Sequence, residues 1–267
     1  MKSHVLTFKN LILCIPLTAS LALLTITTAG ALNLPQLSTN NTNVNTDGIK
    51  GYHYTTSDVS QLRRMLTKDT TEFDATKVNN TIFESIAHDE NRKISLFENW
   101  TLWLAGKLYQ PLSRTQNPYR IADGARGLCS EVSLLFNHIA KLNNFPTRFI
   151  ELNGHVISEV KLDNHWIAVD PDYGITYTVG IQELESPDGE DLMATALRKR
   201  GFDSDTIEWY VDTVQSTHDN RVTEIDTAFS PRLHLLESAS EFLKWIVPIC
   251  LLLFSTYLLL NSRKIEI

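Results

Sequence analysis

Hydrophobic and polar residues are unevenly spread along this chain, with long uncharged runs near both ends and a mixed pattern between them. Near the N-terminus, Lys2 and Lys9 precede an uncharged stretch over residues 11–32. A basic start, an apolar run and small residues at its end are typical of a secretory signal, here with cleavage after Ala31. The run is also long enough to stay in a membrane as a helix of about 20 residues. Residues 1–32 are therefore expected to be either a signal peptide or an N-terminal membrane anchor.

A second apolar run ends shortly before the C-terminus and is followed by a basic tail, residues 262–267. The run is long enough for a membrane span over 242–261 if the amine of Lys244 reaches back to the interface, and the alternative is a buried core helix. Basic residues mark the cytoplasmic flank of a membrane segment. They lie before the first run and after the second, so residues 33–241 are expected on the outer face whether or not the first segment is cleaved.

The region between the two apolar runs begins with a polar segment and continues with a helical pattern. Residues 33–60 are rich in Asn, Thr, Ser and Asp, which is typical of a solvated tether. From about residue 60 to residue 108, apolar positions recur at helical spacing. We expect the last stripe of this pattern to lie in the core: Phe97, Trp100, Leu104 and Leu108.

A helix followed by an antiparallel meander is the next pattern, after a loop over 110–127 that contains Pro and Gly. Residues 130–143 predict an amphipathic helix. Two-residue turns at Asn153-Gly154 and Asp163-Asn164 indicate hairpins. Three strands are expected around these turns: residues 147–152, 155–162 and 165–170. A helix packed on such a meander predicts an α+β fold.

Two further helices and a linker complete the expected organisation. Helices over 191–200 and from residue 203 or 204 to 214 are expected to cover the sheet or to flank its entrance. We therefore expect the soluble domain to span residues 61–220. Residues 221–241 would then form a juxtamembrane segment.

The net charge of the region between the apolar runs limits which partners it can bind. Five of the 24 basic residues but only one of the 31 acidic residues lie outside 33–241, so that region has 19 basic and 30 acidic residues and a net charge of −11. Such a charge disfavours nucleic acid and anionic lipid headgroups as partners of the exported part.

Cysteine usage singles out one residue. Cys14 and Cys250 lie in the apolar runs, so Cys129 is the one cysteine of the exported part and has no partner there for a disulfide. An unpaired thiol in an exported domain is either buried and inert or kept for its chemistry.

Cys129 is predicted at the first turn of the amphipathic helix, where unpaired backbone N–H groups and the helix dipole favour an anion. In the following hairpin, the turn at Asp163-Asn164 puts the side chains of His155 and Asp170 on one face of the sheet. They are diagonal neighbours, about 7–8 Å apart at the backbone and within reach of a side-chain hydrogen bond. Each residue alone has an ordinary structural explanation. Together they suit a nucleophile, a general base and a carboxylate that orients the base.

The residues that carry this arrangement resemble the core of the transglutaminase-like superfamily. Three blocks match in order and spacing: Gly127-Leu128-Cys129, Gly154-His155-Val156-Ile157-Ser158-Glu159-Val160, and His165-Trp166-Ile167-Ala168-Val169-Asp170-Pro171. The resemblance covers about residues 95–180, and the last block, continued to Gly174, is similar to bacterial exported members. It implies a papain-like core and acyl-transfer chemistry on amides. It also implies that Cys129, His155 and Asp170 act as a triad without a metal or an organic cofactor.

An enzyme of this kind needs donors for the oxyanion, and the backbone N–H of Cys129 is expected to be one of them. Four side chains are candidates for another donor: Trp100, Trp103, Gln110 and Gln116. Glu159 shares the face of His155 and is expected to form a structural ion pair or hydrogen bond. A zinc site is disfavoured, because the spacing of its potential ligands fits no compact pattern: Cys129, His138, His155 and His165.

The sequence therefore favours an enzyme that hydrolyses or exchanges amides through a thioester. Its expected substrate is a peptide or protein of the cell envelope, and its expected place is the periplasmic side of a bacterial inner membrane. The alternative, from a different class, is a non-catalytic module that keeps the fold and binds an envelope partner. An intact Cys-His-Asp set favours the enzyme, since binding does not require all three residues.

Overall fold

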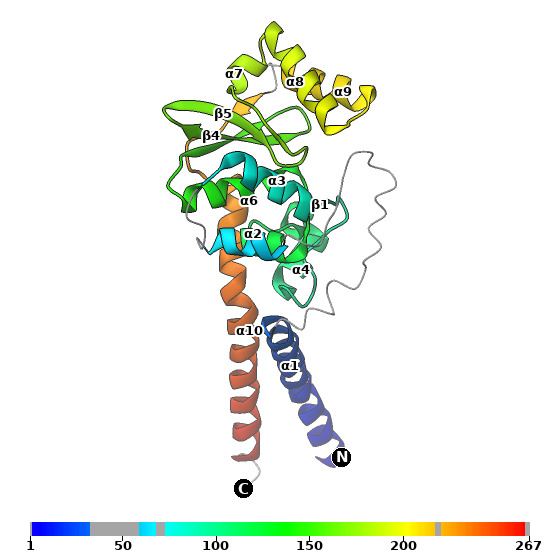
Figure 1. The fold of residues 1–267 in the computed structure, drawn as a ribbon. Helices are drawn as coiled ribbons and strands as arrows, with labels where there is room; N and C mark the ends of the chain where they lie inside the picture. Colours follow the sequence, from blue (N-terminus) through cyan, green and yellow to red (C-terminus); the bar gives the residue numbers. More distant parts are fainter. Residues whose placement is uncertain (1, 33–58, 68–72, 217–219, 265–267) are drawn as a thin grey trace. The chain divides into compact units, whose positions relative to one another are not determined.

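The computed structural model describes the chain except for residues 1, 33–58, 68–72, 217–219 and 265–267, which are drawn as a thin grey trace in Figure 1. The predicted tether over 33–60 lies almost entirely outside the described residues. The chain forms two units. The apolar-helix unit comprises residues 1–42, 93–114 and 232–267, and the α+β unit comprises residues 43–92 and 115–231.

The apolar-helix unit contains the two ends of the chain. Its elements are α1 (Lys2–Ala31), α4 (Trp100–Leu108), the 3-10 turn η3 (Gln110–Ser113) and α10 (Pro231–Lys264). Among the described residues, two segments are long and apolar enough to cross a membrane, Cys14–Ala31 in α1 and Pro231–Asn261 in α10, with mean hydropathies of 1.6 and 2.0. This agrees with the apolar runs of the sequence, although α10 begins well before the predicted start of the span at residue 242.

Helix α4 begins at Trp100 because the side chain of Asn99 caps it, accepting hydrogen bonds from the N–H groups of Thr101 and Leu102. Leu102 is buried, but Leu104 is 53% exposed and Leu108 is 89% exposed. The prediction that this apolar stripe lies in the core is therefore wrong for Leu104 and Leu108. Helical spacing identifies an apolar face, but it does not tell what covers that face.

The α+β unit is built on an antiparallel sheet of strand order β6-β5-β4-β3-β7. The strands are β3 (Thr147–Glu151), β4 (Val156–Leu162), β5 (His165–Asp170), β6 (Ile175–Thr176) and β7 (Arg221–Val222). Ser158 pairs with Val169, which is the predicted register of the β4–β5 hairpin. Asp163 and Asn164 in its turn have φ values of 44° and 70°. A two-residue hairpin turn that matches the twist of its strands requires positive φ at both of these positions.

Helices cover both faces of this sheet (Figure 1). One face packs against α2 (Val59–Leu66), α3 (Ala75–Ser85), α5 (Pro118–Gly124) and α6 (Cys129–Leu142), and the other against α7 (Ile181–Leu184), α8 (Pro187–Arg200) and α9 (Ser204–Gln215). Alternate strand residues serve the two cores: Phe149 and Val160 face α6, whereas Ile150 and Ile157 face α7–α9. The mixed helix and sheet architecture agrees with the predicted α+β class.

The segment predicted as a loop over 110–127 is more ordered than expected. It contains η3, α5 and the short strand β2 (Arg126–Gly127), which pairs in parallel with β1 (Ala87–His88). His88 is the register partner of Gly127, two residues before Cys129. This pairing brings the end of β1 to the start of α6.

Candidate active site

The start of α6 positions Cys129 as the first helical residue. Leu128 is extended, and its backbone N–H donates to the Glu131 carboxylate over 2.9 Å. This bond fixes where the helix begins, so that the first-turn N–H groups lie beside the sulfur. Cys129 is half-buried and packs against the hydrophobic core of the α+β unit.

His155 and Asp170 meet at one end of the β4–β5 hairpin, on one face of the sheet as predicted. His155 Nε2 donates to Asp170 Oδ2 over 2.7 Å, and both side chains are buried. The other carboxylate oxygen, Oδ1, accepts the backbone N–H groups of Asp172 and Tyr173 at 3.0 and 3.1 Å. Asp170 is therefore held by bonds to both of its oxygens, and it fixes the orientation of the imidazole ring.

The surroundings of His155 favour its charged form. Burial lowers the pKa of His155, but the charge of Asp170 and the hydrogen bonds with Asp170 and Cys129 outweigh burial and raise that pKa well above its usual value. An imidazolium is therefore favoured beside the sulfur, which is the partner that a thiolate needs.

Cys129 completes the group predicted from the sequence. Its sulfur, a ring nitrogen of His155 and a carboxylate oxygen of Asp172 all lie within 4.8 Å of one another. Since Nε2 of the ring is bonded to Asp170, Nδ1 is the nitrogen left to face the sulfur. The structure thus brings together the three predicted residues, Cys129, His155 and Asp170.

A second histidine–aspartate pair lies beside this group and was not predicted. His88 Nδ1 lies 2.9 and 3.0 Å from the two carboxylate oxygens of Asp172. Asp172 is 5% exposed, and its hydrogen bond raises the pKa of His88 above its usual value. The position of Asp172 two residues after Asp170 was a signal that could have been read. No pattern in the sequence points to His88, because β1 and β2 have two residues each.

Aromatic side chains surround the imidazole of His155. The ring centroids of Tyr173, Trp209 and Tyr210 lie 5.4, 6.1 and 6.0 Å from that of His155. Tyr210 is fully buried, and this burial together with the charge of Asp170 raises its pKa well above the usual value. Trp209 is 44% exposed and lies at the surface of the site. Helix α9 therefore contacts the candidate base directly. From the sequence, this helix was expected only to cover the sheet or to flank its entrance.

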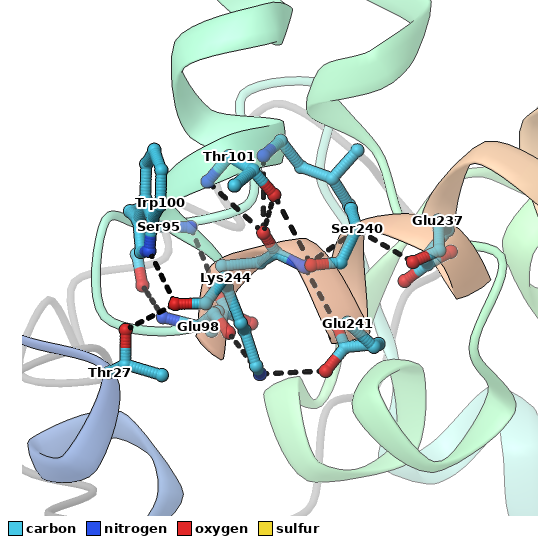
Figure 2. Close-up of polar contacts among 11 residues, drawn as sticks. Thr27, Ser95, Glu98, Trp100, Thr101, Glu237, Ser240, Glu241 and Lys244 are labelled. Carbon is cyan, nitrogen blue, oxygen red and sulfur yellow. Dashed lines mark hydrogen bonds and ion pairs between the residues drawn. The ribbon is translucent and has the colours of Figure 1, made fainter. Parts of the chain in front are cut away.

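Three of the candidate oxyanion donors lie in the apolar-helix unit. Trp100 Nε1 donates to the backbone carbonyl of Lys244 over 3.1 Å, as Figure 2 shows, so its donor is engaged elsewhere. The ring of Trp103 is covered by the Lys107 ammonium at 5.2 Å, and Gln110 is exposed in η3. Gln116 is buried in the α+β unit, the same unit as Cys129.

Glu159 has the structural role that was expected. Its carboxylate forms an ion pair with Arg148 Nε at 2.5 Å and accepts the backbone N–H of Ile181 at 2.7 Å. Among the described residues, Cys129, His155 and Asp172 form the one cluster of side chains suited to a metal ion. His138 and His165 do not belong to it.

Comparison with protein-family models gives no match, and comparison with curated proteins gives none either. The resemblance to the transglutaminase-like superfamily therefore stays a prediction that rests on the three sequence blocks.

Proposed function

We propose that the α+β unit is a cysteine-nucleophile acyl-transfer enzyme with a papain-like core of the transglutaminase-like kind. The proposal rests on one observation, the convergence of the Cys129 sulfur with a buried His155–Asp170 pair. This chemistry requires three groups. They are a half-buried cysteine at a helix start, an imidazole with one nitrogen free to face its sulfur, and a carboxylate held through both of its oxygens.

In the proposed reaction, His155 Nδ1 takes the proton of the Cys129 thiol, and Asp170 stabilises the resulting imidazolium. The thiolate attacks the carbonyl carbon of an amide, and the backbone N–H of Cys129 donates to the oxyanion. The tetrahedral intermediate collapses, the C–N bond breaks, and His155 returns its proton to the leaving amine. This leaves a thioester on Cys129. Attack by water then gives a carboxylic acid, whereas attack by a second amine gives a new amide; either step restores the thiol.

The expected substrate is an amide in a peptide or protein of the cell envelope. Helices α1 and α10 are apolar enough to hold the chain in a membrane, and the positive-inside rule places residues 33–241 on the outer face. In a bacterium this is the periplasmic side of the inner membrane. The net charge of −11 on that region argues against nucleic acid as a partner.

The first test is the reactivity of each cysteine in the full-length protein in detergent. A free thiol loses about tenfold in alkylation rate for each pH unit below its pKa of about 8.5. If Cys129 pairs with His155, its reaction with iodoacetamide stays fast at pH 6. The variant His155→Ala is expected to lose this fast reaction, whereas the control His138→Ala keeps it.

The second test is product formation. The protein is incubated with an extract of envelope proteins and a dansylated primary amine, and new carboxyl ends or dansyl-labelled amides are identified by mass spectrometry. We expect products with wild type and with Cys250→Ala, and none with Cys129→Ala. Equal product patterns from wild type and Cys129→Ala, together with slow alkylation of Cys129 at pH 6, would mean that no enzyme of this kind is present.

A further inference from the structure

The exposed face of α4 is an unusual feature of the apolar-helix unit. Leu104 and Leu108 are four residues apart and thus lie on the same side of the helix. They are 53% and 89% exposed, and Tyr109, which follows the helix, is 59% exposed. The opposite side of α4 is occupied by η3, where a Cβ on Gly106 would lie 2.8 Å from that of Ser113. Leu104 and Leu108 therefore form an exposed apolar stripe on the side of α4 that faces away from η3.

A polar cluster fixes the start of α4 to α10 (Figure 2). Asn99 Nδ2 donates to Ser240 Oγ and to Glu241 Oε1, each over 2.8 Å. Trp100 Nε1 donates to the Lys244 carbonyl over 3.1 Å. That same carbonyl accepts the hydroxyl of Thr27 in α1 at 3.3 Å. One turn of α10 thus meets both α1 and α4.

The charged residues of this cluster limit where the hydrocarbon core of a bilayer can begin along α10. Lys244 forms an ion pair with Glu241 at 2.6 Å and donates to the Glu98 carbonyl at 3.3 Å. The Lys244 ammonium is therefore bound by other residues of the protein. From the sequence, it was expected to reach back to the membrane interface instead. An ion pair of this kind is costly in hydrocarbon, so the apolar core is expected to start beyond Lys244.

The two apolar helices agree on the thickness of that core. In α10, Arg263 lies 19 positions after Lys244, which is about 28 Å of helix. In α1, Thr27 lies 18 positions after Lys9, which is about 27 Å. Both lengths are close to the hydrocarbon thickness of about 30 Å. Since Thr27 is hydrogen-bonded to Lys244, both are expected at one boundary of the membrane, and Lys9 and Arg263 at the other.

We infer that α4 and η3 form an interfacial element that rests on the outer surface of the bilayer. Its start is bonded to α10 at the boundary level, and its exposed residues are those that membrane interfaces attract: Leu104 and Leu108 for the acyl region, and Tyr109 for the headgroups. The segment from Asn99 to Arg114 contains Lys107 and Arg114 and no acidic residue. Its local charge of +2 suits anionic headgroups, in contrast to the net −11 of residues 33–241.

The test measures where the side chain at position 108 lies in the full-length protein. Leu108→Cys is labelled with the fluorophore NBD in a background that lacks Cys14, Cys129 and Cys250, and the protein is reconstituted in vesicles of phosphatidylcholine and phosphatidylglycerol. The matched control is Leu192→Cys, an exposed leucine of α8 in the α+β unit that is 39% exposed. Tyr109→Cys gives a second, independent position on the interfacial element.

The label at positions 108 and 109 is expected to emit at shorter wavelength than at 192. It should also be quenched by lipids that carry a nitroxide near the headgroup, and be protected from iodide. A label that emits as in water and is quenched by iodide as strongly as the control would overturn the inference. So would a blue-shifted label without quenching by nitroxide lipids, since the stripe would then be covered by a second copy of the chain or another protein.

Discussion

Replacing His88 by Gln tests whether the His88–Asp172 pair stabilises the thiolate form of Cys129. The Asp172 carboxylate and the Cys129 sulfur lie within 4.8 Å of each other. Two negative charges at that separation repel by about 3.5 kcal/mol at an effective dielectric constant of about 20. A protonated His88 offsets this repulsion, and the hydrogen bond with Asp172 raises the pKa of His88 and so favours the protonated form. His88→Gln keeps a hydrogen-bond donor of similar reach and removes the charge.

If His88 offsets about half of the repulsion, its loss costs the thiolate about 1.7 kcal/mol, or about a twentyfold smaller thiolate population. The assay is the rate of Cys129 alkylation at pH 6.5, followed by mass spectrometry of the intact protein. We expect His88→Gln to slow the reaction by about ten- to thirtyfold. The control is His138→Gln, a half-buried histidine of α6 whose ring lies 5.6 Å from that of Tyr119, and it should leave the rate unchanged.

A double-mutant cycle separates charge compensation from a general structural effect. Asp172→Asn removes the repelling charge, so that His88→Gln in this background should change the alkylation rate by less than about twofold. Equal slowing in both backgrounds would refute the reasoning, because the effect would then not pass through the charge of Asp172. An unchanged rate in the wild-type background would refute it as well.

Four other outcomes follow from contacts in the candidate site and from the packing of α1. Asp170→Asn presents an amide to His155 Nε2 and favours the wrong tautomer, so kcat/KM should fall by about a thousandfold or more with an unchanged circular dichroism spectrum. Because their partners raise the pKa values of His88 and His155 above about 6.5, both residues stabilise the fold fully below that pH. The urea midpoint should therefore fall as pH rises through the folded-state values, and fall less in His88→Gln. A Cβ on Gly30 of α1 would collide with the Phe97 carbonyl oxygen, so Gly30→Val should loosen α1 from the unit. Since α1 packs there, mass spectrometry of the mature protein should find residues 1–31 retained rather than cleaved as a signal.

The register of the β4–β5 hairpin could be predicted because a strand has only two faces. Once Asp163 and Asn164 were assigned to a two-residue turn, the face of every side chain in both strands was determined, including His155 and Asp170. The start of α6 was nearly as well defined, since Gly127 does not favour a helix and an amphipathic pattern begins directly after Cys129. These features depend on a few neighbouring residues, and the structure agrees with them.

What could not be predicted depends on contacts between distant segments. His88 comes close to the site through a parallel pair of two-residue strands, which leaves no periodicity to detect. Trp209 and Tyr210 reach His155 from a helix whose apolar spacing looks like that of any covering helix. The stripe at Leu104 and Leu108 has the pattern of a core helix, and only the structure shows that these two side chains are exposed.

The difference in exposure between Cys129 and its two partners suits the proposed acyl transfer. His155 is 4% exposed and Asp170 is fully buried, so the charge that develops on the imidazole is stabilised in a region of low dielectric constant, where the carboxylate acts with little screening. The nucleophile itself must meet a substrate, and Cys129 is half-buried. The ring of Trp209 lies 6.1 Å from the imidazole, and Trp209 is 44% exposed, so it adds an apolar surface beside His155. In the proposed reaction, an apolar surface beside the thioester would exclude water, so the balance between hydrolysis and amide exchange would depend on how closely the incoming amine packs against it.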